Sequence, residues 1–327
     1  MRLEKALSSL TLESCSVSPL FKKTSAKVLK LHIPAFKYFL TVSETGSVRK
    51  AADILHVSAS AISRQIINLE HSFGSKLLDR NPSGIQLTVE GKILESHMRK
   101  TIREMEIAKS RIDEISGILS GKVHYATIEG VAKDWLLPEI NNFSKLHPGI
   151  EFSGRISGSD LVYESIRSGN IDFGVVMDNN LPQDIEVIRH FKTDLKVVTT
   201  AKNPISKLKY AELKDLENQK LTMLNDSFLT RKLVTTAANK LNINLNITFE
   251  LDSIEMIKHN VKISNGVSIL PSFSVNKDEC ERNSLVAINI MESQIESPAT
   301  ILCKKPGRHL IAPARKLIDK LAKTSFE

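Results

Sequence analysis

The sequence predicts a small all-α domain, one long helix and a larger two-lobed α/β domain, in that order along the chain. Three observations predict this architecture. Short, capped helical patterns fill residues 33–90, a heptad pattern of apolar residues occupies 91–120, and strand-like runs alternate with helical patterns over 121–327. The length of 327 residues agrees, since a domain usually holds about 100–200 residues.

Composition excludes several classes of protein. Hydrophobic residues make up 41% and charged residues 25%, as in folded globular chains. No stretch reaches the roughly 20 apolar residues of a membrane helix, and the first thirty residues lack the pattern of a secretory signal. Cys15, Cys280 and Cys303 are far apart, which argues against a disulfide framework or a zinc cluster. We therefore expect a cytoplasmic protein with no metal, no cofactor and no membrane partner.

The net charge of +8 is concentrated at the two ends. Residues 1–32 contain six basic and two acidic residues, and residues 298–327 contain seven and two. Residues 121–297 are mildly acidic, with 20 basic and 23 acidic residues. A basic chain is compatible with nucleic-acid binding, but a basic tail is often only solvated, so charge alone decides little. We expect residues 1–32 to be a disordered extension.

The most specific pattern lies in residues 33–90. A first helix is predicted from Pro34, a second over Val48–Leu55 after the N-capping Ser47, and a third after the N-capping Ser58. The second and third helices are joined by a very short connection. Two short helices and a tight turn predict a helix-turn-helix.

The faces of the third helix support this prediction. At about 100° per residue, three apolar residues form a core stripe and three polar residues share the opposite side. The stripe is Ile62, Ile66 and Leu69, and the polar residues are Ser60, Ser63 and Arg64. Short hydroxyls let a helix enter the major groove, and a guanidinium can bond a guanine edge or a phosphate. The alternative is an ordinary solvated helix face.

A hairpin is predicted after these helices. Apolar residues 77–78 and 85–87 flank a turn that contains Pro82 and Gly84. Such a hairpin forms a wing beside the recognition helix, where Arg80 can meet the sugar-phosphate backbone. The alternative for Arg80 is a surface ion pair with Asp79 or Glu70.

The run AFKYFLTVSETGSVRKAADILHVSASAISRQIINLEHSFGSKLLDRNPSGIQLTVEG strongly resembles the winged helix-turn-helix of LysR-type transcriptional regulators. The shared features are the AA pair, the HVS turn, AISRQI, LE…G, LLDR and LT..G. The resemblance implies DNA contacts by Arg49, Ser58, Ala59, Ser60, Ser63, Arg64 and, on the wing, Arg80. Where the family commonly has Gln this chain has Ala59, and Ile67 lies on the polar arc. Both departures favour phosphate contacts and DNA shape over direct base readout.

A linker helix is predicted over residues 91–120, with Thr88 as its N-cap. Mostly apolar residues recur in it at alternating spacings of four and three: Leu94, Met98, Thr101, Met105, Ala108, Ile112, Ile115 and Leu119. Such a heptad seam must be covered, and a coiled-coil dimer would place two recognition helices on two half-sites. The alternative is packing of the seam on the chain's own C-terminal domain.

Residues 121–327 alternate strand and helix patterns, which predicts an α/β fold with largely parallel sheets. We expect lobe one to hold residues 121–195 and 304–323, and lobe two residues 196–303. The segments LLPEINNFSKLHPGIEF, IRSGNIDFGVV, SIEMIK and GVSILP resemble the effector-binding domain of the same family, which is similar to periplasmic substrate-binding proteins. The resemblance thus spans residues 33–322.

A small-molecule effector is expected where strands end and helices begin, between the lobes. The candidate contacts are Ile128, Glu129, Gly130, Met177, Asp226, Ser227, Phe228, Ser253 and Val267. Helix capping by Asp226 and Ser253 and a core position for Phe228 are the alternatives. Glu129, where the family often has Ser or Thr at the start of the first helix, weakly indicates a cationic effector.

The resemblance therefore implies a transcription regulator that binds double-stranded DNA, responds to an effector and forms dimers or tetramers on the nucleoid. RNA polymerase is a candidate further partner. No nucleophile, metal or phosphate-loop motif predicts an enzyme. A solute-binding receptor would leave residues 33–90 unexplained. An architectural DNA-binding protein without an effector response is the remaining alternative.

Overall fold

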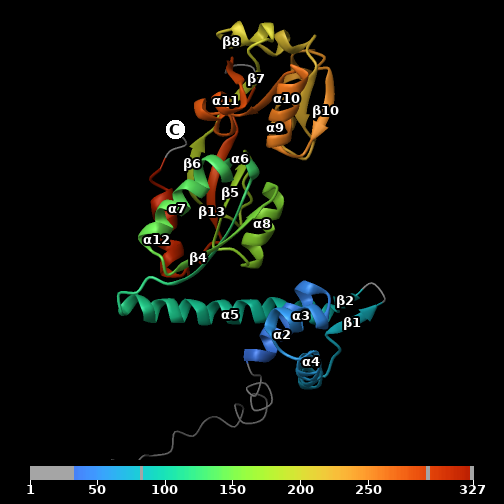
Figure 1. The fold of residues 1–327 in the computed structure, drawn as a ribbon, viewed down its shortest axis with the longest axis vertical. Helices are drawn as coiled ribbons and strands as arrows, with labels where there is room; N and C mark the ends of the chain where they lie inside the picture. The colour runs from blue at the N-terminus through green and yellow to red at the C-terminus, as the bar shows by residue number, and fades with distance from the viewer. Residues whose placement is uncertain (1–32, 82–83, 292–294, 325–327) are drawn as a thin grey trace, which may run out of the picture. The chain divides into compact units, whose positions relative to one another are not determined.

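The computed structural model describes residues 33–81, 84–291 and 295–324 (Figure 1). The chain divides into two compact units, Met1–Ile102 and Arg103–Glu327, and each is described by itself. The extension predicted to be disordered, residues 1–32, lies outside the described residues. Within the described ranges, no helix combines the length and the apolar character that a membrane span requires.

The first unit contains the predicted helix-turn-helix and wing. Its elements are α2 (Ile33–Thr45), α3 (Val48–Leu55), α4 (Ala59–Phe73), β1 (Leu78–Asn81) and β2 (Gly84–Leu87). Both predicted caps are confirmed, because the Ser47 hydroxyl accepts from the Lys50 amide and the Ser58 hydroxyl from the Ala61 amide. The strands β1 and β2 pair antiparallel to form the wing.

The core of the first unit is formed by the apolar stripe that the sequence indicated. Ile62, Ile66 and Leu69 are at most 2% exposed and pack with residues of α2 and α3 such as Phe39 and Ala51. Because these three residues face the core, the other side of α4 is left to solvent. The fold thereby sets which side chains of α4 face the solvent.

The linker helix α5 (Val89–Ile115) begins as predicted, since the Thr88 hydroxyl accepts from the Gly91 amide at 2.9 Å. It ends earlier than the predicted residue 120. Gly117 takes a left-handed φ of +74° and the Ile118 amide bonds back to the Asp113 carbonyl, which closes the helix. Leu119 therefore lies beyond α5 and packs against the core of the second unit, so its assignment to the seam was wrong.

Lobe one of the second unit is a five-stranded sheet in the order β4-β3-β5-β13-β6. Its strands are β3 (Gly121–Thr127), β4 (Ile150–Ile156), β5 (Phe173–Asp178), β6 (Glu186–Lys192) and β13 (Ala299–Lys304). Its helices are α6 (Glu129–Val131), a π-helical turn (Ala132–Leu136), α7 (Leu137–Leu146), α8 (Ser159–Ser168) and α12 (Ala312–Leu321). One apolar core joins the sheet to α7 and α12, and a second joins it to α8, so helices cover both faces (Figure 1).

Lobe two is built on a four-stranded sheet, β11-β7-β12-β8, and a parallel pair, β10-β9. These strands are β7 (Leu195–Thr200), β8 (Tyr210–Ala211), β9 (Leu221–Leu224), β10 (Ile247–Leu251), β11 (Ser268–Pro271) and β12 (Leu285–Ile290). The helices are α9 (Leu229–Lys240), α10 (Ile254–Ser264), α11 (Lys277–Asn283) and three 3₁₀ turns, Pro204–Lys207, Leu213–Leu216 and Ser272–Ser274.

Two features of the second unit differ from the sequence prediction. The sheets are mixed rather than largely parallel, because β13 runs antiparallel to β5 and β6, and β7 runs antiparallel to β11 and β12. Residues 299–303 also belong to the lobe-one sheet, although they were assigned to lobe two. The chain changes lobes twice, once after β6 and once before β13, and β13 then enters the lobe-one sheet between β5 and β6, antiparallel to both.

Candidate functional site

The DNA-facing candidates gather on the exposed side of α4 and at its start. Ser60 and Arg64 are exposed and Ser63 is half-buried. Ala59 is the exposed first residue of α4, and Arg49 is exposed on α3. The hydroxyls of Ser58 and Ser60 lie 3.0 Å apart, so the cap of α4 carries a small polar cluster. The helix thus presents short polar side chains and one guanidinium to the solvent.

Arg80 of the wing is exposed on β1, opposite Ile85 on β2. Neither form of the predicted alternative, an ion pair of Arg80 with Asp79 or with Glu70, is found among the described residues; one oxygen of the Glu70 carboxylate instead accepts from the amides of Leu77 and Leu78 at 2.9 and 3.4 Å. Glu70 therefore ties the base of the wing to the end of the recognition helix. Sequence reasoning missed this role, since a Glu on a helix flank carries no signal for a distant backbone partner.

The linker helix exposes part of the predicted seam. Met105, Ile112 and Ile115 are 59%, 65% and 88% exposed, and Thr101 and Ala108 are exposed as well. The first two seam residues differ, because Leu94 and Met98 are at most 9% exposed in the core of the helix-turn-helix unit. These two were wrong as partner contacts, since their own domain already covers them.

The opposite face of α5 packs on the chain's own α/β domain. Ile107 is 4% exposed in the lobe-one core, and Glu114 pairs with Arg315 of α12 at 3.0 Å. Arg103, one turn before Ile107, pairs with Asp172 just before β5. The alternative to a dimer was packing of the seam on the chain's own C-terminal domain. That packing is found, but on the side of α5 that carries Ile107 and Glu114 rather than on the exposed seam. The exposed side remains available to a partner.

Asp172 is the polar centre of this docking contact. Its carboxylate is fully buried, pairs with Arg103, accepts from the His124 amide at 2.9 Å and lies 3.6 Å from Arg308. Burial alone would lower the pKa of Arg103, but the facing carboxylates of Asp172 and Glu106 outweigh it and raise this pKa. Burial lowers the pKa of His124, so the imidazole near this contact favours its neutral form. Asp172 thus joins α5, β3 and the C-terminal segment.

Two predicted effector contacts meet each other between the lobes. Glu129 at the start of α6 in lobe one accepts from the Ser253 hydroxyl at 2.7 Å and from the Ile254 amide at 2.8 Å. Ser253 is also the N-cap of α10 in lobe two, so the predicted capping alternative is present. Because donors of lobe two already hold both carboxylate oxygens, the geometry does not support the suggestion that Glu129 receives a cationic effector.

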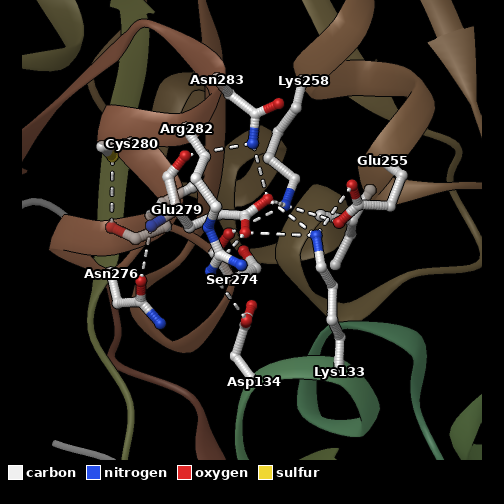
Figure 2. Close-up of polar contacts among 12 residues, drawn as sticks. Lys133, Asp134, Glu255, Lys258, Ser274, Asn276, Glu279, Cys280, Arg282 and Asn283 are labelled. Carbon is white, nitrogen blue, oxygen red and sulfur yellow. Dashed lines mark hydrogen bonds and ion pairs between the residues drawn. The ribbon is translucent and has the colours of Figure 1, made fainter.

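A buried charge cluster is centred on Glu279 (Figure 2). The Lys258 ammonium and the Glu279 carboxylate, 2% and 1% exposed, are 2.6 Å apart, and Lys133 of lobe one reaches Glu279 at 3.0 Å. Burial alone would raise the pKa of Glu279, but the hydrogen bonds from Lys258 and Lys133 outweigh it and lower this pKa. The sequence carries one signal for this cluster, which is a lysine among the buried residues of α10 beside Ile257 and Val261.

The remaining predicted effector contacts are divided between apolar cores and an exposed loop. Val267 is fully buried in the lobe-two core and Met177 is 7% exposed in the lobe-one core, so Val267 in particular was wrong as a pocket residue. Ile128 and Phe228 also pack against apolar cores. Asp226 and Ser227 are exposed in the loop before α9.

A cavity that the sequence did not indicate lies beside the crossing between the lobes. It measures about 490 Å³, and Leu195, Tyr210, Asn289 and Met291 are among its lining residues. In the described part of the chain, no group of three or more His, Cys, Asp or Glu side chains is arranged to hold a metal ion.

Comparisons with known proteins agree with both units. The model of the bacterial regulatory helix-turn-helix protein, lysR family, matches residues 33–92, and that of the LysR substrate binding domain matches residues 116–325. The chain is 28% identical over 286 residues to the transcriptional dual regulator GltC of Bacillus subtilis, which covers 87% of this chain and 94% of that protein. It is 25% identical over 301 residues to the hydrogen peroxide-inducible genes activator of Pectobacterium carotovorum, covering 91% and 96%.

Solved structures share the fold. A full-length OxyR variant from Pseudomonas aeruginosa superimposes with a TM-score of 0.66 at 19% identity, covering 90% of this chain and 96% of the other. CbnR in complex with its target DNA superimposes with a TM-score of 0.65 at 19% identity, covering 89% and 99%. The arrangement of a helix-turn-helix unit, a linker helix and a two-lobed α/β domain is therefore common to all three chains.

Proposed function

Because this chain belongs to the LysR family of bacterial helix-turn-helix regulators, we propose specific roles for its surfaces in DNA binding, assembly and effector response. The chain is a DNA-binding transcription regulator with a domain that binds a small-molecule effector. The observation that carries the proposal is the two-sided α4, whose apolar side is buried while Ser60 and Arg64 stay exposed beside the wing. Its roles are those of a regulator and not of an enzyme, in the cytoplasm and on the nucleoid.

In the proposed complex, α4 enters the major groove. Arg64 bonds a guanine edge or a phosphate, and Ser58, Ser60 and Ser63 contact the backbone or base edges at close range. Arg80 of the wing and Arg49 of α3 contact phosphates, with Ala59 touching at most a thymine methyl group. Few of these side chains read bases, so phosphate contacts and DNA shape supply much of the site preference.

A second copy of the chain covers the exposed seam of α5 in this proposal. We expect Ile112→Glu to convert the dimer to monomers at micromolar concentration, because it places a charge in an apolar helix contact. Sedimentation velocity measures the change. Lys100→Glu, exposed on another side of the same helix, is the control and should leave the dimer intact. An Ile112→Glu protein that stays dimeric would assign assembly to another surface.

The effector acts between the lobes, where the first turn of lobe one meets α10.

One relative is named for a response to hydrogen peroxide, and we do not propose that response for the thiols of Cys280 and Cys303. Burial raises the pKa of Cys280 and raises that of Cys303 to about 12, whereas the thiolate is the form that peroxide oxidises.

RNA polymerase is a further proposed contact. The match to a substrate binding domain disfavours the alternative of an architectural DNA-binding protein.

The function is tested by incubating the purified full chain with fragments of its source genome and sequencing those it retains. We expect a small set of enriched, roughly palindromic sites, since a two-fold dimer presents two recognition helices. Retention that follows only fragment length, with no shared site, would leave non-specific binding and contradict the regulator proposed here.

A further inference from the structure

One short segment of lobe one makes a concentrated set of polar contacts with lobe two. Residues 129–134 cover α6 and the first half of the π-helical turn. Glu129, Lys133 and Asp134 each face a group of opposite charge or a hydrogen-bond donor in lobe two. Groups of the chain itself make all of these contacts, so the lobes have a means of holding together.

Glu129 provides the first of these contacts. Its two carboxylate oxygens receive the Ser253 hydroxyl and the Ile254 amide, which together begin α10. The start of an eleven-residue helix carries free amides and a partial positive charge, and a carboxylate is well suited to both. The carboxylate belongs to the chain, so it stays at this position at a high effective concentration.

Gly130 allows the close approach that this contact needs. A Cβ atom at residue 130 would lie 2.5 Å from the Phe273 ring and 2.9 Å from the Ile254 side chain. A larger residue would therefore require α6, the Phe273 ring or the Ile254 side chain to shift. The close packing of Gly130 thus lies directly beside the hydrogen bonds of Glu129.

Lys133 and Asp134 add charge pairs one turn later, as Figure 2 shows. The Lys133 ammonium lies 3.0 Å from Glu279 and 3.4 Å from Glu255, and the Asp134 carboxylate lies 3.6 Å from the Arg282 guanidinium. Lys258 already neutralises Glu279 from within lobe two, so Lys133 is the cation by which lobe one joins the cluster.

We propose that residues 129–134 form a latch that holds the two lobes together without an effector. In this latch, Glu129 takes the position that the acidic group of a ligand would otherwise take at the start of α10. An effector that acts between the lobes must break the latch, and Glu129 keeps small carboxylates from binding there. This inference rests on the proposed effector domain, but it concerns contacts that can be measured without DNA.

The test measures amide hydrogen exchange in the full chain for peptides that cover the first turn of α10. We expect Glu129→Ala to speed exchange at Ile254 at least about tenfold, since that amide loses its acceptor. Sodium acetate at about 0.2 M should restore much of the protection in Glu129→Ala relative to the same concentration of sodium chloride. Acetate should change nothing in the unaltered chain, where Glu129 already fills the position.

Three further variants make the outcome decisive. Glu164→Ala removes an exposed carboxylate from α8 of the same lobe and should show neither effect. Glu129→Gln keeps the shape and one acceptor oxygen and should lose part of the protection, which guards against misfolding of the alanine variant. Lys133→Met should speed exchange in both α10 and α11. Unchanged exchange in Glu129→Ala, or a loss that acetate repairs no better than chloride, would overturn the latch. Specific DNA binding that survives in either case leaves the proposed regulator function standing.

Discussion

Asp172→Ala is expected to lower the thermal unfolding midpoint of the α/β domain by about 10 °C. Removing one partner of a buried ion pair costs about 3–5 kcal/mol, and each kcal/mol shifts the midpoint of a domain of this size by about 2–4 °C. The loss of stability is larger here, because two guanidinium groups, those of Arg103 and Arg308, would lose their facing carboxylate. The His124 amide would also lose its hydrogen-bond acceptor. The docking of α5 on lobe one should weaken with it.

Circular dichroism on the full chain measures this midpoint. Asp172→Asn is the informative second variant, since it keeps an acceptor for the His124 amide and removes only the charge. Asp184→Ala is the matched control, because Asp184 pairs with Arg167 at the exposed surface and its loss should leave the midpoint in place. A midpoint for Asp172→Ala equal to that of the control would show that the buried pair does not stabilise the domain.

Arg64→Ala is expected to weaken binding to the recovered operator by about 30-fold or more. A contact from an arginine to a base edge or phosphate is worth about 1–3 kcal/mol, and a dimer would lose it in both half-sites. Folding should be unaffected, because Arg64 is exposed on α4 and the core stripe is unchanged.

Titration of labelled operator DNA at several salt concentrations measures the loss. Lys37→Ala removes the same charge from an exposed position of α2 and should weaken binding only a few-fold, equally for specific and unrelated DNA. If Arg64→Ala binds the operator no worse than Lys37→Ala, another element reads the DNA.

The helix-turn-helix unit is the region that the sequence predicted best. Its caps, Ser47 and Ser58, and its core stripe, Ile62, Ile66 and Leu69, lie as expected. Capping and helical periodicity act within a few residues, so they can be read along the chain. The seam of α5 was predicted less well, because Leu94 and Met98 follow the heptad spacing but are buried in the core of the helix-turn-helix unit.

The sequence by itself determined the order of the elements, the two-sided recognition helix and the exposed part of the seam, since local patterns specify all three. Only the tertiary structure decided that β13 returns to lobe one, that Asp172 pairs with Arg103, and that Glu129 accepts a hydrogen bond at the start of α10. The partners in these contacts are 69 to 125 residues apart, or lie in strands joined through the other lobe. Pairing at such a distance depends on how packed elements meet, and no local spacing in the chain encodes it.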